Sequence, residues 1–390
     1  MGGGAAGIFA AIHAAERGKQ VLVLEKSPRI LSKVLISGGG RCNVTHRPLP
    51  PSEMVQNYPR GGKKLKGLFT QWSSAHTMKW FEDRGVQLKI EEDGRVFPVS
   101  NESRDIANAL ERAAFDAGVR IELRLGVKSI EVVPDNGFRV TTDKNQTLFA
   151  RSVVVATGGS PTLRGFDFLA NLGLKIVSPV PSLFTFPIKH KPLTANMGIA
   201  VERAIVYIPD LKQQFEGPVL VTHWGLSGPA VLKLSAFAAR ELAERNHHFE
   251  IRVNWLPSKT HDEVVEMWGH QRKMMNSNPP EISKRLWLYL LERNEISPEI
   301  LASQLGKKNA NRLAEGLLND RYSVQGKTTY KEEFVTAGGV NLTEIDLQTF
   351  AVKRIPGLHI IGEVLDVDAI TGGFNFQAAW AAGYHCGIKI

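Results

Sequence analysis

The chain has 390 residues, of which 43% are hydrophobic, so it can form two domains or one large domain that carries an insertion. It contains no apolar stretch of about 18 residues and no basic leader, which excludes a membrane span and a secretory signal. Only two cysteines occur, Cys42 and Cys386. They exclude a disulfide framework and a four-cysteine metal or iron–sulfur site, and they fit a reducing, cytoplasmic location.

The charge of +9 is unevenly distributed, with 48 basic and 39 acidic side chains in all. Residues 1–70 hold 11 Lys or Arg and only three acids, a net of +8. This segment is either an ordinary basic surface or a surface that meets phosphates, those of a dinucleotide or of RNA.

The first elements form a nucleotide-binding pattern. Residues 2–7, GGGAAG, fit G-x-G-x-x-G, a helix is predicted over 8–17, and a buried parallel strand over 20–25 ends in Glu25. Gly2 permits the tight turn, Gly4 lets a pyrophosphate approach the backbone, and Gly7 lets helix and strand pack closely. The helix N-terminus attracts the phosphates, and Glu25 accepts hydrogen bonds from ribose hydroxyls. A glycine-rich helix start without a ligand is the alternative.

The strand that precedes such a fingerprint is missing, because only Met1 stands before Gly2. Without it the sheet lacks its central member. We therefore expect that the natural chain begins upstream of Met1, or that cofactor affinity is weakened.

Residues 27–70 show no obvious regular element. Within them, three glycines in the run 37–45 let backbone N–H groups approach a flat or anionic ligand, with Gly39 and Gly40 foremost. The basic loop 57–66 is either a solvated surface or a phosphate contact.

Further along, helices are predicted over 67–84 and 102–117, and a hairpin from 86–90 and 96–99. The strands 121–125, 127–133, 138–142 and 148–150 suggest a β-meander. An apolar strand, 153–155, then stops at Ala156, Thr157 and Gly158, which suits a return to the nucleotide-binding sheet with backbone close to the cofactor.

An inserted domain is predicted over 186–335, with short strands at about 186–256 and helices at about 257–330. The nucleotide-binding domain then comprises 1–185 and 336–390. The chain ends as it begins, with a strand at 358–361, a glycine turn and a helix from about 374 to 387. A helix N-terminus aimed at a cofactor ring would stabilise negative charge there.

Six motifs together resemble a known family: GGGAAG at 2–7, ISGGGRCNVTH at 36–46, VVVATGG at 153–159, THWGLSGPA at 222–230, TAGGVNLTEID at 336–346, and PGLHIIGEVLDVDAITGGFNFQAAWAAGY at 356–384. The chain resembles the bacterial NAD(P)/FAD-dependent oxidoreductases, also called aminoacetone-oxidase-like, a group that includes a bile-acid-transforming flavoprotein. The resemblance covers nearly the whole chain.

The resemblance implies an α/β fold: a glutathione-reductase-like Rossmann FAD domain, here without its first strand, with an inserted β-plus-helical domain. It implies that Val127 meets adenine, that Gly362 and Glu363 hold the ribityl and phosphate region, and that Gly373, Phe374 and Asn375 abut the flavin. Ser32 stands where part of the family carries an arginine, so no cation is assumed there. The patterns and the resemblance together predict these FAD-binding residues: Gly2, Gly4, Ala6, Gly7, Glu25, Lys26, Gly39, Gly40, Arg41, Val127, Ala156, Thr157, Gly158, Gly362, Glu363, Gly373, Phe374 and Asn375.

The main functional hypothesis is hydride transfer between flavin N5 and a small molecule held in a cleft between the FAD and inserted domains. Arg41, which would steady an anion, and Cys42, which would donate a proton if its thiol is exposed, are the catalytic candidates. A buried structural thiol is an equal alternative for Cys42. His223 is either a substrate contact or an interface histidine, and Asp366 and Asp368 are acids or bases, or loop hydrogen-bonding groups.

No second G-x-G-x-x-G follows a strand, so NADH or NADPH would dock transiently at the flavin, or oxygen would reoxidise it. A second hypothesis is that the basic segment grips RNA while the flavin modifies a base, although no RNA-binding module is recognisable. A third is a non-enzymatic flavin sensor or scaffold. Nothing in the sequence specifies an oligomeric state.

Overall fold

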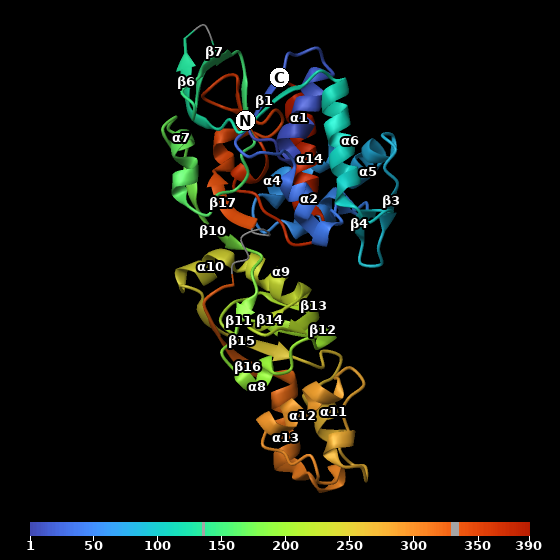
Figure 1. The fold of residues 1–390 in the computed structure, drawn as a ribbon. Coiled ribbons are helices and arrows are strands. Elements are labelled where there is room, and N and C mark those ends of the chain that lie inside the picture. Colours follow the sequence, from blue (N-terminus) through green and yellow to red (C-terminus); the bar gives the residue numbers. More distant parts are fainter. Residues whose placement is uncertain (135–136, 329–334) are drawn as a thin grey trace. The chain divides into compact units, whose positions relative to one another are not determined.

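The computed structural model describes residues 1–134, 137–328 and 335–390. The chain divides into two compact units, unit 1 with Met1–Pro181 and Lys331–Ile390, and unit 2 with Ser182–Tyr330. Unit 1 is therefore built from both ends of the sequence, and in Figure 1 its blue and red segments lie side by side. The sequence predicts domain boundaries after residues 185 and 335. The observed boundaries, after 181 and after 330, lie four to five residues earlier.

Two parallel strand pairs form the centre of unit 1. Strand β1 (Leu22–Glu25) pairs with β5 (Arg120–Leu123), and β9 (Val153–Val155) pairs with β20 (Leu358–Ile360). The second pair continues antiparallel into β19 (Ala351–Val352) and β18 (Ile345–Asp346).

The position between β1 and β9 is bridged by two residues rather than by a strand. The Gly2 N–H donates to the Leu24 carbonyl, and the Ala156 N–H donates to the Met1 carbonyl, both over 2.8 Å. The Met1 amino group donates to the Val154 carbonyl at 2.8 Å. These contacts link the two strand pairs where a Rossmann sheet has its first strand.

Helices from opposite ends of the sequence pack together in unit 1. Helix α1 (Ala5–Ala15) lies against α14 (Phe374–Gly387), and α6 (Ser103–Asp116) lies beside α1 (Figure 1). The backbones of α1 and α14 approach each other closely at Gly383. A Cβ there would lie 2.9 Å from the Ala6 carbonyl oxygen, so only glycine fits. Alanines on the facing side of α1 keep that surface shallow.

The segment 27–84 differs from the sequence prediction. Residues 27–70, expected to lack regular elements, contain α2 (Ser32–Ile36), α3 (Pro51–Met54) and α4 (Gly62–Gln71). The single helix predicted over 67–84 is wrong, because α4 and α5 (Ser74–Glu82) are separate. Ser73 caps α5 reciprocally with His76, and this local hydrogen bonding starts a new helix.

Small antiparallel sheets complete unit 1. The predicted hairpin is confirmed as β3 (Leu88–Ile90) and β4 (Arg95–Pro98), which β2 (Thr45–His46) joins. The predicted meander is confirmed for its last three strands, β6 (Val127–Val133), β7 (Gly137–Thr142) and β8 (Thr147–Ala150). Its first predicted strand, 121–125, is wrong as a meander member, because it forms β5 and pairs parallel with β1. The remaining elements are η1 (Ser37–Gly40), η2 (Val55–Asn57), η3 (Leu163–Phe166), α7 (Asp167–Ala170), β10 (Ile176–Ser182), β17 (Val335–Val340), η6 (Leu342–Glu344) and η7 (Gly362–Val364).

Unit 2 combines an antiparallel sheet with helices. Its strand order is β11-β14-β13-β12-β15-β16. The strands are β11 (Phe186–Pro187), β12 (Ala200–Tyr207), β13 (Gln214–Val221), β14 (Gly225–Ser227), β15 (His248–Asn254) and β16 (Asp320–Gln325). The helices are α8 (Lys191–Thr194), α9 (Pro229–Phe237), α10 (Ala239–Glu244), α11 (His261–Glu266), η4 (Met274–Asn276), α12 (Lys284–Arg293), η5 (Ala302–Gln304) and α13 (Gly306–Leu318).

Strand β16 corrects the prediction of a wholly helical segment over 257–330. It returns to the sheet, and its first residue, Asp320, is buried. The Asp320 carboxylate accepts hydrogen bonds from Trp255 Nε1 at 3.0 Å and from Arg293 Nε at 2.7 Å. These bonds fasten the helical part to the sheet across a shared core that includes Trp287.

None of the helices in the described parts of the chain is both long and apolar enough to cross a bilayer.

Candidate functional site

The glycine turn before α1 combines tight packing with open space. A Cβ on Gly2 would overlap the Ala156 carbonyl, and one on Gly7 would overlap the Gly2 carbonyl, so both positions require glycine. At Gly4, by contrast, a Cβ would meet no atom within 4 Å. No side chain caps α1 and its first turn has no acid. The helix start is thus free to bond an anion that approaches Gly4.

The acid at the end of β1 is fixed beside this turn. Glu25 Oε2 accepts from the Gly3 N–H at 2.6 Å, and Oε1 accepts from the Ser27 N–H at 2.8 Å. A carboxylate has further lone pairs, so Glu25 can still accept from hydroxyl groups.

Two other predicted residues lie near Glu25. The Glu25 carbonyl accepts from the Leu125 N–H at 2.9 Å, which brings the start of β6 and its half-buried Val127 to this edge. A Cβ on Gly126 would lie 3.3 Å from the Lys26 Cβ. Lys26 and Val127 therefore border the same edge of unit 1 as Glu25.

The end of β9 contributes backbone to the same place. Ala156 contacts Gly2 and Gly7, and Thr157 is exposed. Gly158 has φ +76°, and a Cβ there would meet nothing within 4 Å. The predicted residues of this strand end thus adjoin the glycine turn and leave room beside it.

The glycine run 38–40 is similarly open. Gly39 and Gly40 have φ +68° and +85°, and neither has an atom within 4 Å of a Cβ. Arg41, next in the chain, donates from Nη1 to Glu91 Oε1 at 2.7 Å, and its guanidinium lies 3.9 Å from the Phe97 ring centroid. The hairpin β3–β4 therefore already holds this arginine.

Cys42 is fully buried and has φ +59°. Burial raises the pKa of its thiol to about 12. The proton-donating role considered for Cys42 requires an exposed thiol, and the structure does not place the thiol at the surface.

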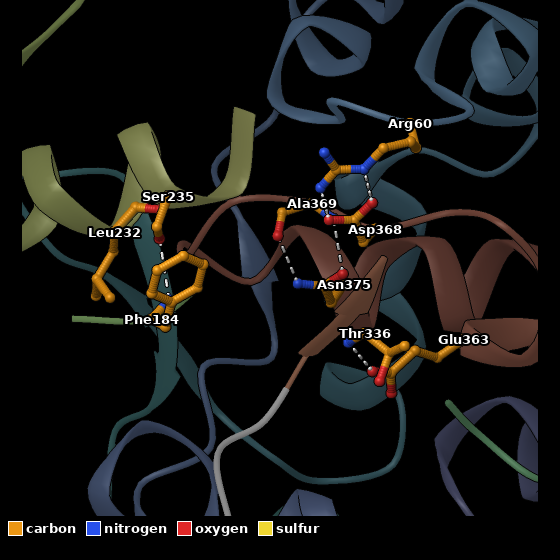
Figure 2. Close-up of polar contacts among 9 residues, drawn as sticks. All are labelled: Arg60, Phe184, Leu232, Ser235, Thr336, Glu363, Asp368, Ala369 and Asn375. Atoms are coloured by element: carbon orange, nitrogen blue, oxygen red, sulfur yellow. Dashed lines mark hydrogen bonds and ion pairs between the residues drawn. The ribbon is translucent and has the colours of Figure 1, made fainter. Parts of the chain in front are cut away.

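Side chains at the start of α14 fix its position, but none of them caps the backbone N–H groups of its first turn. Gly373 has φ +85°, and a Cβ there would overlap the Thr45 carbonyl. The Phe374 ring stacks on His46 with centroids 4.6 Å apart. The Asn375 amide accepts from the Ala369 N–H at 2.9 Å and donates to the Ala369 carbonyl at 3.0 Å (Figure 2). No acid or capping side chain occupies the first turn.

Glu363 connects three separate segments. Its Oε1 accepts from the Thr336 N–H at 3.0 Å, and its Oε2 accepts from Lys33 Nζ at 2.6 Å (Figure 2 draws the first). The neighbouring Gly362 would place a Cβ 3.1 Å from the Ala6 Cβ, so this segment adjoins the glycine turn. No cation is expected at Ser32, and the structure has one at the next position, Lys33. The sequence gives no local signal that Glu363 is the partner of Lys33.

The loop before α14 also contains a buried ion pair that sequence reasoning did not find. Asp368 is fully buried, and its carboxylate accepts from both Nε and Nη2 of Arg60, whose side chain is 9% exposed (Figure 2). This pair fixes the loop that leads into α14. Asp368 therefore has the geometry of a loop hydrogen-bonding group, the alternative to an acid–base role. His223 lies in unit 2, exposed, with its ring 4.3 Å from that of Trp224.

Helices α1 and α14, from opposite ends of the sequence, pack together, and neither has a capping side chain or an acid in its first turn. The start of α1 also has open glycine backbone and the Glu25 carboxylate beside it, and this arrangement fits FAD. The chain is thereby a Rossmann-type FAD-dependent oxidoreductase. It belongs to the family described as HI0933-like protein Rossmann domain, whose model matches residues 1–389.

Curated relatives cover nearly the whole chain. It is 30% identical to the ribosomal RNA dihydrouridine synthase of Escherichia coli, over 99% of this chain and 96% of the relative. It is 29% identical to the enzyme of the same name from Haemophilus influenzae, over 100% and 97%. It is 28% identical to the 3-dehydro-bile acid delta(4,6)-reductase of Clostridium scindens, over 99% and 97%.

Among solved structures, the chain is similar in fold to the 3-ketosteroid-delta4-(5alpha)-dehydrogenase of Rhodococcus jostii. The TM-score is 0.52 at 14% identity, over 100% of this chain and 95% of that one. This likeness concerns the fold alone.

Proposed function

We propose that the chain reduces a carbon–carbon double bond conjugated with a carbonyl group. The observation that carries the proposal is the shared chemistry of the three relatives, because forming dihydrouridine and reducing a bile-acid alkene both add two hydrogens across such a bond. Bound FAD, once reduced by NADH or NADPH, would supply the hydride from N5. The chain's own residues provide binding, orientation and electrostatics.

The roles of the residues follow from their positions. The turn with Gly2, Gly4 and Gly7 and the start of α1 would hold the pyrophosphate, and Glu25 the ribose. The uncapped start of α14 favours negative charge beside it. Arg41 keeps N–H donors beyond the one that Glu91 takes, so it can also contact an anionic substrate.

For the substrate, we propose a uracil base in RNA. Two relatives carry that activity in their names, and residues 1–70 have a net charge of +8, which suits a phosphate backbone. A small unsaturated ketone is the second candidate, favoured by the name of the bile-acid reductase. NADH or NADPH, docking transiently, is the proposed reductant.

The test is anaerobic. The bound flavin is first reduced with NADH or NADPH, and its visible absorbance is then followed after adding one of three compounds. These are a uridine-containing RNA, the same RNA with dihydrouridine at those positions, and a steroid dienone. We expect the uridine RNA to reoxidise the flavin and the dihydrouridine RNA to leave it reduced. Reoxidation by the dienone alone selects the second candidate, and reoxidation by none of them contradicts the proposed reaction.

A further inference from the structure

Helix α4 carries three exposed lysines on one side. The side-chain ammonium groups of Lys63, Lys64 and Lys66 form no hydrogen bond or ion pair with the residues that the structure describes. The opposite side of the helix is anchored in the core by Leu65, Leu68 and Phe69, which fix its orientation. We name the three lysines the α4 lysine row.

The position of the row on its helix is electrostatically unfavourable. Lys63 and Lys64 lie in the first turn of α4, where the helix dipole is positive, and no acid accompanies them there. Between Glu53 and Glu82 the chain has no acidic residue at all. No acid near these lysines in the sequence compensates their charge, and none of their ammonium groups forms an ion pair within the described residues, so an external anion would supply a counter-charge.

The row begins beside the loop that leads into α14. Arg60, three residues before Lys63, forms the buried ion pair with Asp368. The Tyr58 hydroxyl donates to the Phe374 carbonyl at 2.6 Å, and the Ile370 N–H donates to the Asn57 carbonyl at 3.0 Å. The segment that carries the lysines is thus fixed to the end of unit 1 where the ring of FAD is expected.

A groove continues the surface from Lys64. It has a volume of about 400 Å³ and contains a second cation, Lys353, together with Asp346. The Asp346 carboxylate is already occupied by the Gln348 N–H at 3.0 Å and the Thr349 hydroxyl at 3.0 Å. A polyanion that follows the lysines into this groove would meet the Lys353 ammonium there, and also the negative charge that Asp346 keeps.

We propose that the α4 lysine row binds the phosphate backbone of the RNA whose base is reduced. The inference rests on the RNA substrate of the proposed function. The exposed residues of α4 other than the lysines are Gly67, Thr70 and Gln71, so the helix has no apolar side chain to insert into a lipid surface. A phosphate chain matches the uncompensated charge and the place of the row beside the cofactor site.

The experiment measures RNA binding against KCl concentration by fluorescence anisotropy, using FAD-loaded protein and a uridine-containing RNA hairpin. The variant is Lys63→Gln/Lys64→Gln/Lys66→Gln. The matched control, Lys212→Gln/Lys307→Gln/Lys308→Gln, removes the same charge from exposed lysines of unit 2. An unchanged flavin absorbance spectrum verifies that each variant is folded.

We expect the α4 variant to bind RNA at least tenfold more weakly at low salt. The slope of log K against log salt should fall by about 2, since each lost single-strand phosphate contact contributes about 0.7. The control should keep the wild-type slope. Equal losses in both variants would show that only net charge matters and would overturn the inference.

The design separates two failures. If wild-type protein shows no salt-dependent RNA binding, the RNA substrate itself is wrong. If the wild type binds RNA and RNA reoxidises its flavin, but the α4 variant keeps the same affinity and slope, only the lysine row is wrong. Polyglutamate of similar charge serves as the competitor. If polyglutamate displaces the RNA at equal charge concentration, the lysine row binds an acidic protein and the inference is overturned.

Discussion

The buried ion pair between Arg60 and Asp368 joins two loops that carry the site. Replacing Asp368→Asn would leave the Arg60 guanidinium buried without its counter-charge. We expect a loss of about 3–5 kcal/mol in the free energy of unfolding, measured by urea denaturation. Asp83→Asn, which breaks the exposed pair with Lys79, should change it by less than about 1 kcal/mol. Equal effects of the two changes would contradict the stabilising role of the buried pair.

The Cys42 thiol makes stability depend on alkaline pH. Its pKa is about 12 in the folded protein and 9.0 in the unfolded reference. Above pH 9 the unfolded chain releases this proton while the folded chain keeps it, so the free energy of unfolding falls as pH rises. Between pH 8 and 10.5, Cys42→Ser should lose about 2 kcal/mol less than the wild type. An identical pH dependence of the two proteins would mean that the thiol ionises in the folded state.

Single residues of the site differ in how far the sequence predicts them. Glu25 is predictable because strand, helix and acid follow one another within one βαβ-type pattern. Lys33 and Arg60 are not, because their partners, Glu363 and Asp368, lie 330 and 308 positions away. Neither carries a local signal that distinguishes it from an ordinary surface cation.

At the scale of elements, the start of α14 depends on one backbone conformation. Gly373→Ala adds a Cβ that overlaps the Thr45 carbonyl, at a positive φ. We expect FAD affinity to fall at least tenfold, measured by titrating apoprotein with FAD, because the helix start must shift. Gly85→Ala is the control, with a similar φ of +82° and no atom within 4 Å. It should cost about 1–2 kcal/mol of stability and leave FAD affinity unchanged, and a loss of affinity there too would contradict the local explanation.

Element boundaries show where local patterns mislead. The hairpin β3–β4 and the meander β6–β8 follow their turn residues and are predicted well. The break between α4 and α5 could not be predicted, because the pattern of large apolar residues continues across it. Phe69, Trp72 and Trp80 are all buried. The decisive feature is the reciprocal capping of Ser73 and His76, where histidine takes the place that Glu or Gln usually occupies.

At the scale of the whole molecule, the division into two compact units predicts two unfolding transitions. The residues proposed to hold FAD lie in unit 1, so excess FAD should raise only that transition, by about 2.7 kcal/mol at a concentration 100 times Kd. Calorimetry of the holoprotein with increasing FAD measures this.

A matched pair of variants assigns the transitions. Leu110→Ala in α6 and Leu290→Ala in α12 each remove a fully buried leucine, one from each unit. Each should lower its own transition by about 2–5 kcal/mol. If both variants lowered the FAD-sensitive transition alike, the units would unfold as one.

The meeting of α1 with α14 also has a consequence for biogenesis. During translation the glycine turn and Glu25 emerge long before residues 358–387, which supply the other half of the proposed FAD site. With the site divided in this way, FAD would load only after the last residues have been synthesised. A shortage of FAD would then leave a complete polypeptide with an empty site, and would not interrupt synthesis.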